Sequence, residues 1–212
     1  MSAQPSAKED TPASTRRRKT PRRQAEILHA AALIFYEKGY QAASTQDIGD
    51  AVGLLKGSLY HYISSKEDLL FDIANAQNEL VVAASADIRR DLGKSALVRL
   101  TLLIRAHIEL FTATYTESIV YIRETHHLSE ERKESINAGA RQYRDAVVEV
   151  LQQGVNEGTI DPTIDLRLAA ISILGLLNSM SAWYRVDGEY RPQEIANQLA
   201  RLVISGLAIR VP

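Results

Sequence analysis

Residues 45–70, TQDIGDAVGLLKGSLYHYISSKEDLL, constrain the fold of this chain more than any other stretch. Apolar residues recur at helical spacing over 48–52, and Thr45 is a candidate N-cap. Gly53 is expected to end this helix, because glycine adopts left-handed backbone angles without steric cost. The next segment, 56–63, is too short to be a stable helix alone. Two short helices joined by a tight turn indicate a helix-turn-helix, whose second helix lies in the major groove of DNA.

The second helix of this motif carries the candidate DNA-reading side chains. Leu59 and Ile63 are expected to be buried. The side chains left free are those of Lys56, Ser58, Tyr60 and His61. We expect Lys56 and Ser58 to reach base edges, and Tyr60 to contact a base methyl group or a phosphate.

The same stretch resembles the N-terminal signature of the TetR family of transcriptional regulators. The matches at the family's spacing are Thr45, Asp47-Ile48, Val52-Gly53, Lys56-Gly57-Ser58-Leu59-Tyr60-His61-Tyr62 and Ser65-Lys66-Glu67-Asp68-Leu69. The resemblance implies that Thr45, His61 and Lys66 hold the DNA backbone. It also implies that Gly57 belongs to the DNA-binding surface.

Two positions depart from the family pattern. Leu55 stands where the family often has Ser or Thr, so the second helix lacks a hydroxyl N-cap. Gly49 replaces the usual alanine, and we expect it to weaken the first helix by roughly 0.5–1 kcal/mol. Neither change alters the helix-turn-helix prediction.

Charge is distributed unevenly along the chain. The formal net charge of all 212 residues is −1, but residues 1–23 hold seven basic against two acidic side chains, a net charge of +5 that leaves −6 for the rest. Residues 1–19 are expected to form a disordered basic arm that binds DNA phosphates; a solvated tail without function is the alternative. Arg22 and Arg23, at the start of the first long helix, are expected to reach a phosphate.

Composition narrows the possible functions. The chain has no cysteine, and none of its five histidines forms an i, i+4 pair with another, so we predict neither a metal site nor a cofactor. No apolar run reaches the length of a membrane span, and the N-terminus lacks a signal-peptide core. Enzyme motifs are also missing, although helical enzymes exist without them. We therefore expect a cytoplasmic protein that is not an enzyme.

The remaining sequence is helical throughout, so the prediction is an all-α protein in two parts. A DNA-binding head covers residues 20–67, and a helical ligand-binding and dimerisation body covers residues 68–212. The helices expected outside the helix-turn-helix cover about 21–38, 65–90, 95–115, 119–125, 130–157, 163–185 and 192–208.

The expected helix at 164–184 is apolar on nearly every side, and such a helix must be covered on every side. One face can meet the core of its own chain, while the other favours a second subunit. Together with the last helix, this predicts a two-fold homodimer with Leu177 and Leu202 in its interface. The alternative is a central helix buried within one chain.

Polar residues on the apolar helices are the candidates for effector contact. They are His107, Tyr121, Asn178, Trp183 and Arg185. Each can equally be a hydrogen-bonded core or interface group. Residues 177–185 resemble a subset of TetR regulators that controls fatty-acid and steroid breakdown. In that subset the inducer is often an acyl-CoA thioester, whose anionic carrier group could meet Arg141, Arg144 or Arg185.

The sequence as a whole therefore predicts a repressor that binds an inverted-repeat operator as a dimer and is released by a small hydrophobic effector. The resemblance favours a long-chain or polycyclic acyl-CoA thioester. One alternative is a multidrug-type sensor, whose pocket needs an inward-facing carboxylate such as Glu109 or Glu124. Another is a helical-bundle enzyme or ligand carrier that kept a vestigial head. In a dimer, the two recognition helices must lie about 34–36 Å apart to enter successive major grooves.

Overall fold

The computed structural model describes residues 21–209, and the arm predicted at 1–19 lies outside them. Within this range the chain is all-α and has no strand, as predicted, apart from an isolated bridge between Ile160 and Ala208. The helices are α1 (Pro21–Lys38), α2 (Thr45–Ala51), α3 (Lys56–Leu59), α4 (Lys66–Arg90), α5 (Ala96–Ala113), α6 (Tyr115–Glu124), the 3-10 helix η1 (Thr125–His127), α7 (Glu130–Asn156), α8 (Leu166–Asn178), α9 (Met180–Trp183) and α10 (Pro192–Leu207).

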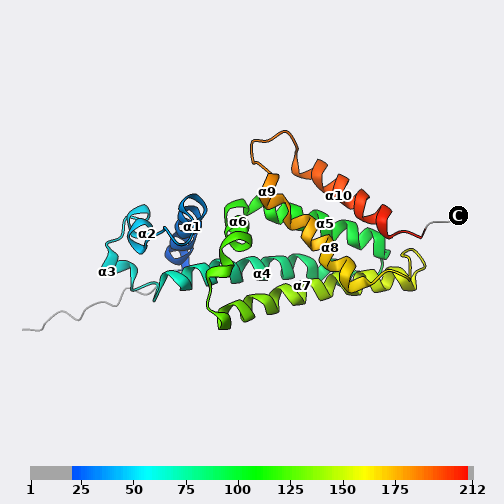
Figure 1. Ribbon diagram of the computed structural model, residues 1–212, viewed down its shortest axis with the longest axis horizontal. Helices are drawn as coiled ribbons and strands as arrows, with labels where there is room; N and C mark the ends of the chain where they lie inside the picture. Colours follow the sequence, from blue (N-terminus) through cyan, green and yellow to red (C-terminus); the bar gives the residue numbers. More distant parts are fainter. Residues whose placement is uncertain (1–20, 210–212) are drawn as a thin grey trace, which may run out of the picture.

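Helices α1 to α3 form the head at one end of an elongated molecule (Figure 1). Phe35 of α1, Ile48 of α2 and Leu59 of α3 are fully buried and share one hydrophobic cluster with the start of α4. Ile63 is also buried, as the sequence predicts, and Gly53 has φ 65, the left-handed angle expected at the end of α2. Burial of these side chains fixes the angle between the two helices of the motif.

The N-cap of α2 is Ser44, and the prediction of Thr45 was wrong. The Ser44 hydroxyl accepts from the Asp47 N–H, and the Asp47 carboxylate accepts from the Ser44 N–H at 2.8 Å, which makes a capping box. This reciprocal pair satisfies two free N–H groups at once. Thr45 becomes the first helical residue, and its hydroxyl is left for other partners.

Helix α3 is shorter than the predicted 56–63. After Leu59 the backbone bonds tighten, with the His61 N–H donating to Ser58 O at 3.2 Å and the Tyr62 N–H donating to Leu59 O at 2.8 Å. These i to i+3 bonds are typical of a last helical turn. Tyr60 and His61 therefore project from a turn rather than from a regular helix.

Gly49 is packed more tightly than the sequence indicates. A Cβ atom at this position would lie 2.9 Å from the backbone oxygen of Leu54. Because the obstructing atom belongs to the backbone, an alanine here requires the turn itself to shift. The expected gain in helix propensity from alanine is therefore opposed by a steric cost.

Helix α4 leads from the head into the body and packs along α7 (Figure 1). Ser65 caps α4 in a second capping box with Asp68. The body core joins buried side chains of α5, α7, α8 and α10, such as Ile104, Leu151, Ile173 and Val203. Two layers of long helices therefore enclose the body's apolar centre.

The predicted helix at 163–185 is interrupted, because α8 ends at Asn178 and α9 begins at Met180. Leu177 is only 1% exposed and belongs to the body core, so its predicted place in a subunit interface was wrong. Leu202 remains 55% exposed on α10, and the exposed apolar residues of α8 are Leu168 and Ile171. These three side chains are apolar surface of α8 and α10 that is left uncovered in one chain.

The segment Leu166–Trp183 is long and apolar enough, by length and composition, to cross a membrane, and 22% of it is buried within the chain. A uniformly apolar helix at a subunit interface passes the same test. The exposed apolar face of α8 therefore fits a covering subunit as well as it fits lipid.

Candidate DNA-binding and effector-binding sites

Five of the predicted DNA-contacting positions lie together on the head. Tyr60 is 46% exposed, and its hydroxyl lies 3.4 Å from the Thr45 hydroxyl. Gly57 and His61 are exposed, and Ser58 is half-buried beside them. The side chain of Lys56 lies outside the described residues. This surface combines hydroxyl, imidazole and aromatic groups at the start of α2 and along α3, which suits contact with base edges and phosphates.

The ammonium group of Lys66, which was predicted to hold the DNA backbone, makes hydrogen bonds within the head. Its Nζ donates to Tyr40 O at 2.7 Å and to Ala43 O at 2.8 Å, and lies 3.4 Å from Gln41 O. It also lies 4.3 Å from the centre of the Tyr40 ring. A lysine has three N–H donors, so these contacts occupy the ammonium group inside the head. Lys66 holds the α1–α2 connection in place.

The two arginines predicted to reach phosphate differ from one another. Arg23 donates to Val52 O at 2.6 Å and to Glu26 at 2.7 Å. Because Val52 is the C-cap residue of α2, Arg23 caps the C-terminus of that helix within the head. The Arg22 side chain is 92% exposed, and its one ion pair among the described residues is with Glu26, at 3.2 Å. A surface pair of this kind is weak. Of the two, Arg22 is the one free to meet a phosphate.

Helix α6 and η1 connect the head to the body. Glu117 of α6 lies 2.9 Å from the His29 ring of α1, and Glu124 accepts from the Tyr40 N–H at 3.1 Å. The Tyr40 ring stacks on His127 of η1 with centroids 5.3 Å apart. Val120 of α6 is buried in the same cluster as the head residues. A displacement of α6 would therefore move the head.

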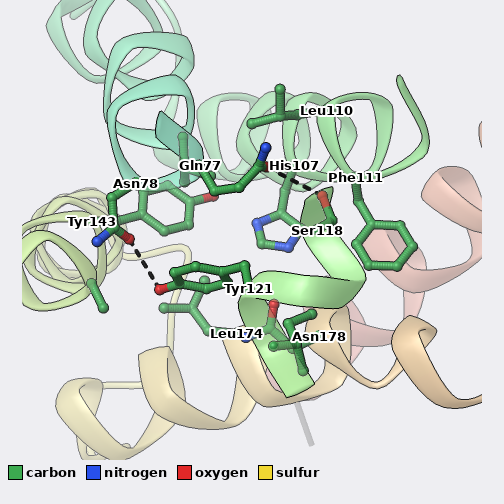
Figure 2. Close-up of a pocket in the computed structure, with 13 residues that line it drawn as sticks. Gln77, Asn78, His107, Leu110, Phe111, Ser118, Tyr121, Tyr143, Leu174 and Asn178 are labelled. Atoms are coloured by element: carbon green, nitrogen blue, oxygen red, sulfur yellow. Dashed lines mark hydrogen bonds between the residues drawn. The ribbon is translucent and has the colours of Figure 1, made fainter. Parts of the chain in front are cut away.

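The body contains a cavity of about 90 Å³ between α4, α5, α6, α7 and α8 (Figure 2). Its lining residues are Gln77, Asn78, Val81, His107, Leu110, Phe111, Ser118, Tyr121, Ile122, Ala140, Tyr143, Leu174 and Asn178. None of these residues carries a formal charge at neutral pH, because His107 has a pKa lowered to about 4 by burial. Burial also raises the pKa values of Tyr121 and Tyr143. The cavity therefore suits an uncharged ligand group.

Most polar groups of this wall already have partners within the chain. The Gln77 carbonyl accepts from the hydroxyls of Thr114 at 3.1 Å and Ser118 at 3.2 Å. The Asn78 amide donates to Ile136 O at 2.8 Å and accepts from the Tyr121 hydroxyl at 3.0 Å. These bonds hold α4, α6 and α7 together around the cavity.

The predicted effector residues separate into two groups. His107, Tyr121 and Asn178 line the cavity. Trp183, 45% exposed, instead lines a separate open depression of about 610 Å³ beside α10. Arg185 is exposed and donates to the neighbouring Tyr184 O. The interruption after Asn178 turns these two residues away from the cavity.

Four polar cavity residues were not predicted from the sequence: Gln77, Asn78, Ser118 and Tyr143. Gln77 lies four residues after Ile73, on the apolar stripe of α4, and is 6% exposed. A polar side chain on an otherwise apolar stripe was the signal that could have found it. Tyr143 reads from the sequence as an ordinary core residue.

An open groove adjoins the cavity on the side of α7 and α8. It has a volume of about 360 Å³ and shares Ala140, Leu174 and Asn178 with the cavity wall. Arg141 and Arg144 line it, as do Asn137, Ile171 and Gly175. The Nε of Arg144 makes no hydrogen bond and lies 3.6 Å from Asp145. A ligand that spanned both spaces would place an apolar part in the cavity and an anionic part near these arginines.

Comparison with known proteins identifies the class to which this fold and these sites belong. Residues 27–73 match the model for bacterial regulatory proteins of the tetR family, and residues 93–207 match the model for the tetracyclin repressor-like C-terminal domain. The chain is a DNA-binding transcriptional regulator and belongs to the TetR family. Members of these families are regulators rather than enzymes.

Individual members of this family are similar over most of the chain. The HTH-type transcriptional repressor KstR2 of Mycobacterium tuberculosis is 32% identical, over 87% of this chain and 92% of that protein. The structure of KstR2, described as a ketosteroid transcriptional regulator, has a TM-score of 0.82 at 30% identity and covers 91% of this chain and 98% of that one.

Two further relatives are similar over nearly the same length. The fatty acid metabolism regulator protein of Bacillus subtilis is 26% identical, over 86% of this chain and 94% of that protein. The structure of AibR in complex with isovaleryl coenzyme A and operator DNA has a TM-score of 0.76 at 30% identity, and covers 88% of this chain and 98% of that one.

Proposed function

We propose that this protein is a cytoplasmic, homodimeric repressor that leaves an inverted-repeat operator when an acyl-CoA thioester binds its body. Its relatives include a named repressor and a regulator solved with both isovaleryl coenzyme A and operator DNA. The observation that carries the proposal is the position of α6. Ser118 and Tyr121 of this helix face the cavity, while its Glu117 and Glu124 hold the head.

The dimer follows from the uncovered apolar face of the body. Leu168, Ile171 and Leu202 are each roughly half exposed, although they lie on the two helices with which the sequence predicts subunit contact. A second copy packed on the same face buries these side chains in a two-fold interface. Only a dimer presents two α3 helices to successive major grooves of one operator.

The effector class follows from the cavity and the groove together. The acyl part enters the uncharged cavity, and the phosphates of the carrier lie in the groove beside Arg141 and Arg144. The cavity is smaller than the roughly 300–1,000 Å³ of usual ligand pockets. A short acyl group therefore fits this arrangement better than the long-chain or polycyclic group that the sequence favours.

The multidrug alternative lacks its counter-charge. Glu109 is exposed on α5, and Glu124 is engaged with Tyr40 of the head. Neither residue lines the cavity. A buried cation without a neighbouring carboxylate costs too much free energy to bind well. An enzyme or carrier with a vestigial head has no specific support, because family models of transcriptional regulators match both the head and the body.

The test of effector class is release from DNA. Operator fragments selected from genomic DNA are bound to the protein, and isovaleryl-CoA, longer acyl-CoAs, the free acids and bare CoA are titrated against the complex. The proposal requires release by a thioester at concentrations where its acid and bare CoA have no effect. Release by cationic dyes instead would contradict it.

The test of the DNA surface uses two exposed tyrosines. Tyr60→Ala is expected to weaken operator binding by roughly 1–3 kcal/mol while leaving scrambled DNA little changed. Tyr190→Ala, a control on the body at 59% exposure, should change neither. Unchanged operator affinity for Tyr60→Ala would mean that another face of the head reads the bases.

A further inference from the structure

A buried ring nitrogen of the cavity wall has no hydrogen-bond partner among residues 21–209. The Nδ1 of His107 is buried and makes no hydrogen bond. Figure 2 shows the ring at the centre of the cavity, between Tyr121 and the bonded pair of Gln77 and Ser118. The ring also stacks on Tyr143, with centroids 5.9 Å apart. A buried, unpaired polar atom that faces a cavity points to a hydrogen-bonding ligand group.

The protonation state of His107 decides which group can bind there. Burial lowers the pKa of His107 to about 4, so the ring is neutral at pH 7. Asn178 makes a side-chain hydrogen bond with the ring that acts in the opposite direction on the pKa. Because Nδ1 makes no hydrogen bond, the bond with Asn178 uses Nε2, and we take the Nε2–H as its donor and the Asn178 amide oxygen as its acceptor. A neutral imidazole has only one N–H, so Nδ1 is left as an acceptor.

We propose that the acyl group of the effector carries a hydroxyl that donates a hydrogen bond to the Nδ1 of His107. This inference rests on the proposed function and adds the chemical class of the acyl group. A ketone oxygen at the same place would meet the lone pair of Nδ1 and gain nothing. A carboxylate would meet the same lone pair and lose its hydration without a counter-charge. His107 thereby becomes the residue that distinguishes hydroxylated from plain acyl groups.

The expected selectivity follows from the cost of leaving Nδ1 unpaired. A hydrocarbon group in the cavity offers Nδ1 no hydrogen-bond donor and excludes water from it, whereas a hydroxyl group donates a hydrogen bond to Nδ1. The hydroxylated thioester should therefore act at a concentration roughly tenfold or more lower than its plain counterpart. The carbonyls of Gln77 and Asn78 already accept bonds within the chain. The Nδ1 of His107 makes none, so it gains the most from a ligand hydroxyl.

The experiment compares three matched CoA thioesters of a four- or five-carbon acid that are plain, keto-substituted or hydroxyl-substituted at the same carbon. Each is titrated against the operator complex of full-length protein, and its binding to free protein is measured by calorimetry. The inference requires the hydroxyl compound to be the strongest on both measures. Equal potency of all three, or preference for the ketone, would overturn it while the proposed function stands. If neither these three compounds nor any other thioester releases the protein from the operator, the proposed function itself is contradicted.

Two variants separate recognition from packing. His107→Phe keeps a flat ring against Tyr143 but has no acceptor, and it should bring the hydroxyl and plain compounds to equal potency. Ile122→Val, which changes the volume of the same wall without changing its polarity, should keep the preference. Operator affinity without effector and the thermal midpoint report whether each variant is folded. A folded His107→Phe protein that still prefers the hydroxyl compound would assign the selectivity to another residue.

Discussion

Replacement of Lys66 by Met should destabilise the head rather than weaken its contact with phosphate. The ammonium group serves two half-buried carbonyl oxygens, those of Tyr40 and Ala43, at 2.7 and 2.8 Å. A third, longer contact reaches Gln41 O at 3.4 Å, and the charge lies over the Tyr40 ring. Methionine preserves most of the aliphatic stem but donates no hydrogen bond. The two carbonyl oxygens therefore lose their partner while they stay partly shielded from water.

The expected loss can be estimated from these contacts. A hydrogen bond to a charged group contributes about 1.5–3 kcal/mol, and a partly exposed cation–π contact about 0.5–1 kcal/mol. Water compensates for part of the lost hydrogen bonding, because Lys66 is only half-buried. We expect the free energy of unfolding to fall by roughly 2–4 kcal/mol, which corresponds to about 4–16 °C in thermal midpoint for a chain of this size.

The assay measures stability and salt dependence on the same protein. Thermal unfolding gives the midpoint, and operator affinity at 25 °C over a range of salt concentrations gives the slope of log K against log salt. Arg22→Gln is the matched control, because its side chain is 92% exposed. It should flatten the slope by about 1 and leave the midpoint unchanged. If Lys66→Met keeps the midpoint and flattens the slope as Arg22→Gln does, Lys66 contacts phosphate and the reasoning is refuted.

Three further outcomes are expected. Leu202→Arg should give a folded monomer in sedimentation that no longer binds the inverted repeat. Leu177→Arg should instead unfold the body, because Leu177 is 1% exposed and a buried unpaired charge is strongly destabilising. A folded Leu177→Arg monomer would contradict this expectation. The pKa of His107 is lowered from 6.5 to about 4, so the unfolded chain binds more protons between these values. The contribution of His107 to the free energy of unfolding is complete above pH 6.5 and falls by about 3 kcal/mol on acidification to about pH 4. Denaturant unfolding should therefore show a smaller loss of stability in acid for His107→Phe than for the unchanged protein. Gly49→Ala should lower the midpoint, because its Cβ would lie 2.9 Å from Leu54 O; a raised midpoint would mean that helix propensity dominates.

The head was largely predictable because its signals are short-range. Burial of Leu59 and Ile63 and the turn at Gly53 follow from residue type and spacing within a few positions. The N-cap was misplaced by one residue, since Ser44 and Thr45 both carry a hydroxyl. The choice between them depends on which one reaches the Asp47 N–H, and that distance is set by the incoming backbone.

Interactions with distant backbone groups could not be predicted. Lys66 and Arg23 look in the sequence like free cations, but their acceptors are backbone oxygens of Tyr40 and Val52. A backbone carbonyl leaves no mark in the pattern of side chains, so the sequence shows the donor without its partner. Phosphate contact and internal capping are therefore indistinguishable before the fold is known.

The apolar helix α8 shows a second limit. A helix without a polar face gives no indication of which side meets its own core, so Leu177 and Leu202 were placed in one interface although only Leu202 is exposed. The interruption between Asn178 and Met180 then separates Asn178, in the cavity, from Trp183, which lies outside it. No glycine or proline marks that interruption in the sequence.

The volume of the cavity is consistent with the binding free energy that an effector must supply to release the repressor. To move a repressor from about 99:1 to 1:99 between its DNA-binding and released states takes a roughly 10⁴-fold difference in affinity, about 5.5 kcal/mol. Two subunits share this, so each site needs about 2.7 kcal/mol. Burial of about three to four methylene groups at 0.8 kcal/mol each supplies that amount if the groups are buried only in the released state. A cavity of about 90 Å³ that must widen to admit such an acyl group meets the condition, because its wall includes Ser118 and Tyr121 of α6, the helix that holds the head.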